Sequence, residues 1–166
     1  MEPASNRGVS GLREIRYSRR EIDTLVSALK NQPREAATLV ILAGASTEQK
    51  TVAAETIAKQ LQLNLVRVDL STIVSKFIGE TEKNIDRVFD DAARAGAVLL
   101  FDEGDALFGK GTDAPPSGDG SPAMRYLLQR IDAYSGIALM IVNDPKPAGE
   151  EATRLRRAKT VVVVDR

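Results

Sequence analysis

LVILAGASTEQKTVAAETIAKQL, residues 39–61, is the stretch that decides the fold. It joins a short apolar run to a helical pattern through the segment GASTEQKT, which begins at Gly44. A phosphate-binding loop between a strand and a helix has the spacing G-x-x-x-x-G-K-[ST]. Lys50 and Thr51 match that spacing, whereas Gln49 stands where the second glycine is needed. The stretch therefore predicts a strand–loop–helix unit with an altered phosphate-binding loop.

The composition is that of an ordinary soluble globular domain. Hydrophobic residues make up 43% of the 166 residues, and 23 basic residues balance 23 acidic ones, which argues against a bulk nucleic-acid or membrane-surface binder. The chain has neither Cys nor His, so disulfides, thiolate chemistry, Ser-His-Asp catalysis and His-based metal sites are excluded. No apolar run approaches the ~20 residues that span a bilayer, and the N-terminus lacks the apolar core of a secretory signal. We therefore expect a cytoplasmic protein.

Short apolar runs alternate with helical patterns along most of the chain. The expected strands are TLVILAG, LNLVRVD, AVLLFDE, GIALMIVN and KTVVVVD. Because these runs are apolar on both faces, the alternation predicts a parallel sheet covered by helices on both sides. The first helix is expected to begin after Ser18, with Glu21 completing a capping box. We expect residues 1–17 to be a flexible segment, residues 18–166 to form one domain, and residues 109–122 to form a surface loop inside it.

A second group of candidate residues ends the run AVLLFDE, where four apolar residues lead into Asp102 and Glu103. In the hydrolysis of a Mg-nucleotide, one carboxylate holds the metal and the next polarises the attacking water. A strand that ends in solvated acidic residues is the ordinary alternative. Both motifs, in this order and on parallel strands, favour a nucleotide site.

The segment LVRVDLSTIVSKFIGETEKNIDRVFDDAARAGAVLLFDEGDALFGK closely resembles AAA+ ATPases that carry KYIGETEKNL and LLFDEADALFG segments. The similarity covers roughly residues 39–165. It implies a three-layer α/β P-loop NTPase fold whose five-stranded parallel sheet has the order 5-1-4-3-2. It also implies a core that binds and hydrolyses ATP with Mg²⁺ in a ring, usually a hexamer, that remodels protein clients. The balanced charge makes nucleic acid the less favoured client.

The resemblance assigns roles to single residues. GIALMIVN is similar to the strand that ends in the family's sensor-1 asparagine, here Asn143, and the family's arginine fingers fall eleven and fourteen residues later, at Arg154 and Arg157. Phe77 stands at the position of the aromatic residue that faces a threaded protein substrate. The implied roles are phosphate binding by Gly44, Ala45, Ser46, Thr47, Glu48, Gln49, Lys50 and Thr51, Mg²⁺ binding by Thr51 and Asp102, and catalysis by Glu103, Asn143, Arg154 and Arg157.

Each carried-over residue has an ordinary structural alternative. Asn143 could cap a turn after its strand, and the two arginines could form a solvated basic cluster. Phe77 could pack in the core, as large aromatic residues usually do. The spacing from Asn143 to the arginines favours the catalytic interpretation.

The chain departs from the family's GPPGTGKT loop because Thr47 and Gln49 replace glycines, and Glu48 adds a negative charge. If Gln49 had to adopt positive φ, the strain would cost about 1–2 kcal/mol, which predicts weakened nucleotide binding. The chain also stops before the helical lid that follows the core in the family, either because the sequence is part of a longer protein or because the protein lacks the lid. With the lid absent, we expect a monomer or weak oligomer.

Three functions remain open at this point. The leading hypothesis is an AAA+ core that binds ATP or ADP with Mg²⁺ and hydrolyses ATP as part of a ring. The alternative is a catalytically impaired AAA+-like subunit that acts as a structural or interaction module, which Gln49 favours and the intact Asp102 and Glu103 oppose. A small-molecule P-loop kinase is disfavoured, because it does not explain the spacing from Asn143 to Arg157.

Overall fold

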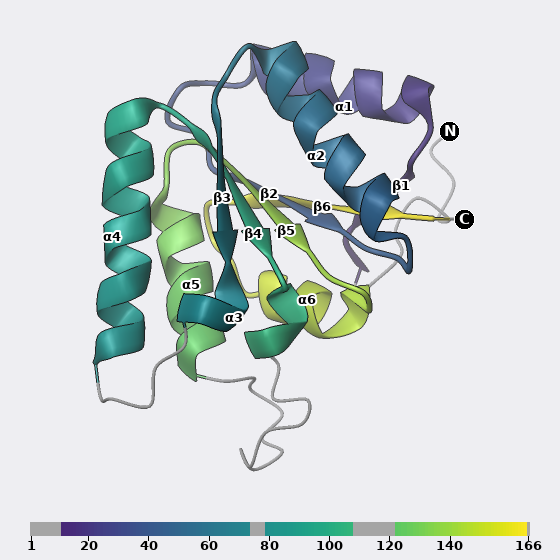
Figure 1. Ribbon diagram of the computed structural model, residues 1–166. Helices are drawn as coiled ribbons and strands as arrows, with labels where there is room; N and C mark the ends of the chain where they lie inside the picture. Colours follow the sequence, from purple (N-terminus) through teal and green to yellow (C-terminus); the bar gives the residue numbers. More distant parts are fainter. Residues whose placement is uncertain (1–10, 74–78, 108–121, 166) are drawn as a thin grey trace.

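A computed structural model describes residues 11–73, 79–107 and 122–165 of the chain. It consists of one parallel β-sheet with helices on both faces, as the alternation of strands and helices predicts (Figure 1). Phe77 and residues 109–121 lie outside the described residues. The expected contact of Phe77 with a protein substrate and the expected surface loop therefore remain predictions.

The described part contains six strands, six α-helices and one 3₁₀ helix. The strands are β1 (Arg13–Arg16), β2 (Thr38–Leu42), β3 (Leu65–Asp69), β4 (Val98–Asp102), β5 (Ile137–Ile141) and β6 (Lys159–Val164). The helices are α1 (Arg19–Asn31), α2 (Thr47–Leu61), α3 (Leu70–Ile73), α4 (Glu80–Ala95), the 3₁₀ helix Gly104–Leu107, α5 (Pro122–Ala133) and α6 (Pro145–Ala152).

The sheet has the order β1-β6-β2-β5-β4-β3, and all its strand pairs are parallel. The order differs from the prediction because the sheet has six strands and not five. The five predicted strands, β2 to β6, keep the relative order 5-1-4-3-2, and β1 is added beside β6 at the edge.

Strand β1 corrects the expectation of a flexible N-terminal segment for residues 13–16. Residues 13–16 pair in parallel with β6, and Ile15 lies opposite Val163 with only 5% of its surface exposed. A strand of four residues with one buried side chain gives no alternation that a sequence pattern can reveal. Pairing with β6, which is set by the tertiary fold, holds this segment in place.

The start of α1 has the predicted Ser18 cap, but the Glu21 carboxylate accepts from the Ser18 hydroxyl and not from its backbone N–H, so the capping box is incomplete. The backbone N–H of Glu21 donates to Ser18 Oγ at 3.1 Å, and the Ser18 hydroxyl donates to the Glu21 carboxylate at 3.0 Å. The apolar face of the helix is buried through Ile22, Leu25, Val26 and Leu29. This cap satisfies an N-terminal backbone donor that the helix itself leaves free.

Helix α6 was not predicted, although its start carries recognisable signals. Asp144 caps the helix by accepting from the Lys146 N–H at 3.0 Å, and Pro145 occupies the first helical position. Its eight residues are too few for a clear apolar period. The helix connects β5 to the segment that precedes β6.

Two apolar layers hold the sheet between its helices. One lies under α1 and α2, and the other under α4, α5 and α6. In the second layer, Phe89 on α4 contacts the rings of Phe101 and Tyr134 with centroid distances of 5.7 and 5.5 Å. Loops follow the carboxyl ends of the strands, and these loops carry the candidate site.

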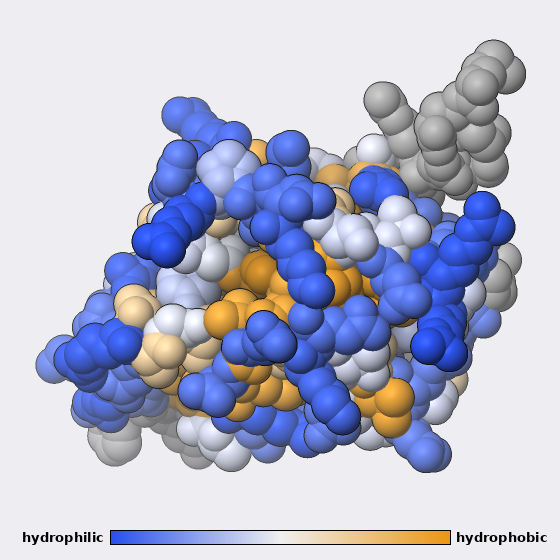
Figure 2. All heavy atoms as spheres, turned by 90° about the horizontal axis from the view of Figure 1, so that it is seen from above, coloured by the Kyte–Doolittle hydropathy of each residue, from blue (hydrophilic) through white to orange (hydrophobic). Residues whose placement is uncertain are grey.

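The opposite, amino edge of the sheet has an apolar hollow of about 570 Å³ with a polar rim (Figure 2). Leu29, Leu63 and Phe89 contribute apolar surface, and Arg34 and Asp90 are among the polar residues. The hollow is separated from the candidate site by the length of the strands.

We predict that Ile15→Ala lowers the free energy of unfolding by about 2–4 kcal/mol, because it removes a buried side chain from the sheet edge. Urea denaturation measures the change. Arg13→Ala, on an exposed position of the same strand, should stay within about 0.5 kcal/mol of the wild type. Equal stabilities for wild type and Ile15→Ala would show that residues 13–16 are loose in solution.

Candidate functional site

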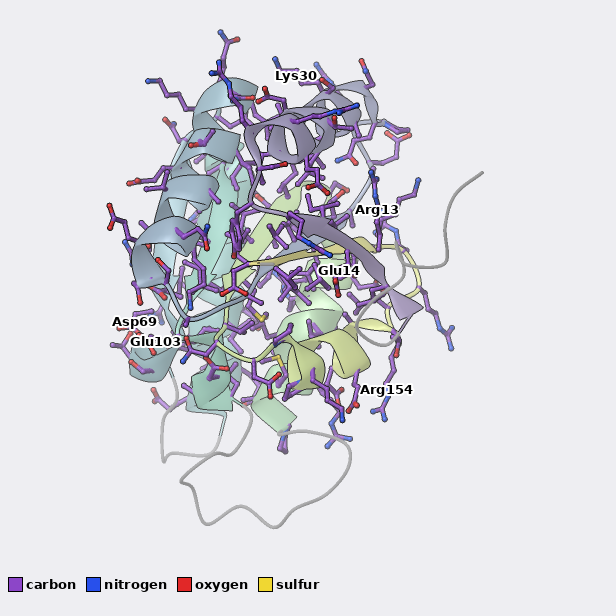
Figure 3. All side chains as sticks on the ribbon, turned by 90° about the vertical axis from the view of Figure 1, so that its right-hand side faces the viewer. Arg13, Glu14, Lys30, Asp69, Glu103 and Arg154 are labelled. Carbon is purple, nitrogen blue, oxygen red and sulfur yellow. The ribbon has the colours of Figure 1, made fainter. Side chains whose placement is uncertain are left out.

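The candidate residues from three strands meet at the carboxyl edge of the sheet. Gly44 follows β2, Asn143 follows β5 and Asp102 ends β4, and these strands are neighbours in the order β2-β5-β4. Glu103 comes directly after Asp102, and Figure 3 shows it beside Asp69 at the end of β3. This edge is where parallel α/β sheets bind ligands.

The segment expected to wrap a phosphate is helical in this structure. Helix α2 already begins at Thr47, and its cap is Ser46, whose Oγ accepts from the Gln49 N–H at 3.1 Å. Gln49 therefore has helical φ, and the expected strain at this position is absent; among the described non-glycine residues only Gln62 and Glu103 have positive φ. The expectation was wrong because Thr and Gln are compatible with a helix, whereas glycines at these positions favour an open loop.

Lys50 points into the loop and is the most deeply buried charged residue of the site, with 2% of its surface exposed. Its Nζ donates to the carbonyl oxygens of Gly44 at 2.7 Å and Val142 at 3.1 Å, and to Asn143 Oδ1 at 2.9 Å. An ammonium group has three donors, so all of them have partners. Lys50 and Asn143, two residues that the sequence assigned to one site, are thus in direct contact.

Backbone donors at the start of the loop are also engaged. The N–H of Gly44 donates to the Asn143 carbonyl at 3.2 Å, and the N–H of Ala45 donates to Asp165 Oδ2 at 3.3 Å. The N–H of Lys50 donates to the Ser46 carbonyl at 3.2 Å. In this closed form the loop directs these three N–H groups to protein acceptors.

Asp102, the expected Mg²⁺ ligand, pairs with Arg67 of the neighbouring strand β3. Arg67 donates to Asp102 Oδ2 through Nε at 3.2 Å and also through a terminal nitrogen, and the Glu103 N–H donates to Oδ1 at 2.8 Å. The hydrogen bond with Asp102 is the main cause that raises the pKa of Arg67. The sequence analysis missed Arg67, because only the register of β3 against β4 brings it to Asp102.

Glu103, the expected water activator, has a strained backbone. Its φ is 61°, in the left-handed region that a residue with a Cβ seldom adopts. The residue is exposed, and its carbonyl accepts from the Ala106 N–H at the start of the 3₁₀ helix. Such strain costs about 1–3 kcal/mol and is concentrated at functional sites.

The two expected arginine fingers are not brought together with the other candidates: Arg157 lies near the amino edge of the sheet, and Arg154 follows α6. Arg157 donates to the Glu35 carbonyl, just before β2, at 3.0 Å, and Arg154 is 3.6 Å from the Glu151 carboxylate. A strand rises about 3.3 Å per residue, so the two ends of β2 are more than about 13 Å apart. Figure 3 shows Arg154 well apart from Asp69 and Glu103. Arg157 thus lies near the start of β2, whereas Lys50 lies near its end.

Asp132, at the end of α5, anchors the segment that carries these arginines. Its carboxylate accepts from the backbone N–H groups of Arg156 at 3.2 Å, Arg157 at 2.8 Å and Ala158 at 2.8 Å. Burial acts to raise the pKa of Asp132, but the three N–H groups outweigh it and the net pKa is lowered. The sequence analysis missed this residue, because an acid near a helix end is common in surface helices.

Over residues 11–73, 79–107 and 122–165, no group of three or more acidic side chains is placed to hold a metal ion. A nucleotide-bound Mg²⁺ is usually held by only one or two protein carboxylates together with phosphates, so this does not test the proposed ligands. No helix in the same ranges has the length and apolar character that crossing a membrane requires.

Comparison with known proteins agrees with this architecture. The sequence model of the family "ATPase family associated with various cellular activities (AAA)" matches residues 40–166. An uncharacterised AAA family ATPase, y4kL, of Sinorhizobium fredii is 33% identical over 70% of this chain and 36% of its own length. Proteasome-activating nucleotidase 1 of Haloferax volcanii is 35% identical over 57% of this chain and 24% of its own. The putative ribosome biogenesis ATPase nvl of Dictyostelium discoideum is 31% identical over 72% of this chain and 12% of its own length.

The family match covers most of the chain and includes the loop, the acidic strand end and both arginines. The chain therefore belongs to the AAA family of ATPases. It spans little more than a third of the length of y4kL and smaller shares of the other two relatives.

We predict that Glu103→Gly raises the free energy of unfolding by about 0.5–1 kcal/mol. Glycine relieves the strain of the left-handed backbone, and its greater entropy in the unfolded chain offsets only part of that gain. Urea denaturation measures the change. Glu103→Gln keeps the Cβ and the strain and should match the wild type. A gain of equal size in both variants would trace the effect to the carboxylate and not to the backbone.

We predict that Asp132→Asn lowers stability at pH 7 by about 1–2 kcal/mol, because the three N–H groups lose a charged acceptor. A carboxylate whose folded pKa is lowered stabilises the fold above its ordinary pKa of 3.8 and loses that contribution as pH falls through the folded value. The wild type and Asp132→Asn should therefore converge in acid. Glu150→Gln, an exposed acid of α6, should show no such convergence; parallel pH curves for Asp132→Asn would contradict the anchor.

Proposed function

We propose that this chain is a AAA module that binds Mg-nucleotide weakly, hydrolyses it little, and acts as a subunit beside other AAA subunits. The observation that carries the proposal is the early start of α2 at Thr47, with Lys50 enclosed by three oxygens. This closed loop differs from an open phosphate-binding loop, whose backbone N–H groups face the ligand.

Opening the loop has a cost that nucleotide must overcome. The N–H groups of Gln49 and Lys50 both donate to Ser46, through its hydroxyl and its carbonyl. Breaking two such bonds costs about 1–3 kcal/mol, which weakens binding roughly fivefold to a hundredfold. This cost replaces strain at Gln49 as the physical reason for weak binding.

The residues suited to Mg²⁺ in this proposal are Thr51, through its hydroxyl, and Asp102, through its carboxylate. Oxygen donors of these kinds are those that Mg²⁺ prefers, and the bound ion would neutralise phosphate charge. Arg67 must then share or leave Asp102, because it donates twice to the same oxygen. Glu103 would polarise water and Asn143 would orient it.

The position of the arginines supports action on a neighbouring subunit. Arg157 lies near the start of β2 and Lys50 near its end, too far apart to serve the same nucleotide, whereas an arginine finger supplied in trans is an established use. Asp132 fixes the backbone that carries Arg157. A protein client, contacted through Phe77, is the client class we propose by analogy with the proteasome-activating relative.

A fully active ATPase is the second candidate. Asp102, Glu103 and Asn143 support it, since they end or follow neighbouring strands at the same edge as Lys50. The two candidates differ in turnover, so phosphate release measured beside binding separates them. Rapid turnover by the wild type would select the active ATPase.

We predict that Thr47→Gly/Gln49→Gly tightens Mg-ADP binding about fivefold, because two glycines weaken the first turn of α2 by about 1 kcal/mol and favour the open loop. Isothermal titration calorimetry measures the affinity. The matched control is Thr47→Ala/Gln49→Ala, since alanine removes the same side chains but strengthens the helix.

The alanine pair should bind no better than the wild type. If both pairs bind equally tightly, side-chain bulk and not helical structure closes the loop. If neither pair nor the wild type binds Mg-ATP or Mg-ADP at high protein concentration, the nucleotide-binding part of the proposal is wrong.

A further inference from the structure

Asp165 is an acidic residue that the sequence analysis left without a role, and it lies directly on the loop. It follows β6, which neighbours β2, so its side chain reaches the segment after β2. Its Oδ2 accepts from the Ala45 N–H at 3.3 Å. An anion of the chain itself therefore binds the first residues of the phosphate-binding segment.

The fit between Asp165 and Gly44 is close. A Cβ added to Gly44 would lie 2.6 Å from Asp165 Oδ2, nearer than real Cβ contacts, so the carboxylate occupies the space that glycine leaves open. Gly44 has φ of 123°, which also favours glycine. The carboxylate is thus packed against the backbone of the loop as well as hydrogen-bonded to it.

The residue just before the loop is held by Tyr17, which directly follows β1. The Tyr17 hydroxyl donates to the Ala43 carbonyl at 2.7 Å. Burial, and then the charge of Asp165, raise the pKa of Tyr17. Arg16, Tyr17, Gln49 and Asp165 together line a small cavity beside the loop.

We propose that Asp165 is an intramolecular clasp that holds the loop closed and competes with the phosphates of an incoming nucleotide. Its hydrogen bond and its packing retain residues 44–45 where they lie. Its negative charge occupies the loop entrance and repels a polyphosphate. Nucleotide must displace the clasp before the first turn of α2 opens. This inference rests on the proposed nucleotide binding and adds a regulator to that site.

The charge-matched control for Asp165 is Asp144. Asp165 directly follows β6, Asp144 lies three residues after β5 at the same edge, and both are exposed. Asp144 caps α6, and asparagine caps a helix as well as aspartate does. Asp144→Asn therefore removes one negative charge near the loop without touching Gly44 or Ala45.

The test compares the wild type, Asp165→Ala and Asp144→Asn in two measurements. Calorimetry with Mg-ADP should give Asp165→Ala about tenfold tighter binding, as expected for loss of a competing charged hydrogen bond, and Asp144→Asn less than a twofold change. Hydrogen exchange of the free proteins should show faster exchange at the Ala45 amide in Asp165→Ala alone.

The outcomes separate the clasp from the proposed function. Wild type and Asp165→Ala binding Mg-ADP equally, or equal exchange at Ala45, would overturn the clasp and leave weak nucleotide binding intact. Binding by Asp165→Ala without detectable binding by the wild type would support the clasp and correct the proposed wild-type affinity. Absence of binding in every variant, including Thr47→Gly/Gln49→Gly, would overturn both.

Discussion

The buried ammonium group of Lys50 connects the loops after two neighbouring strands, and the rest of the site depends on this connection. It reaches from α2 to the second residue after β2 and to the two residues after β5, so one side chain ties a helix to two neighbouring strand ends. A buried charge is tolerated only when its donors are satisfied, and here all three are. Moving Lys50 toward a phosphate therefore means exchanging three protein acceptors for ligand oxygens.

The other candidate groups at the carboxyl edge also have protein partners that a ligand must replace. Asp102 has Arg67, Ala45 has Asp165, and Gln49 has Ser46, so the groups suited to Mg²⁺ and phosphate already hold partners of the appropriate charge or polarity. In the proposed function, these protein partners occupy the positions of the Mg²⁺ and phosphate ligands. Nucleotide affinity then depends on a difference between two well-bonded states, and small changes in the protein can shift it strongly.

The two edges of the sheet carry different candidate residues. The carboxyl edge gathers the phosphate and metal candidates, whereas Arg157 lies near the amino edge, where Asp132 holds the backbone of residues 156–158. Strands of five or six residues separate these groups rigidly. In the proposed function, Arg157 therefore serves the nucleotide of a neighbouring subunit.

The amino-acid sequence by itself determined the alternation of strands and helices, the Ser18 cap, and the candidate residues at strand ends, because apolar period, capping chemistry and motif spacing are local. It also indicated the family through a long, specific segment. Tertiary structure decided what depends on neighbours distant in sequence: β1 against β6, Arg67 against Asp102, Asp132 under the arginine segment, and Asp165 on Gly44. The conformation of GASTEQKT depends on both. Ser46 within the segment caps α2, whereas Asn143 and Asp165, distant in sequence, hold the residues before the helix.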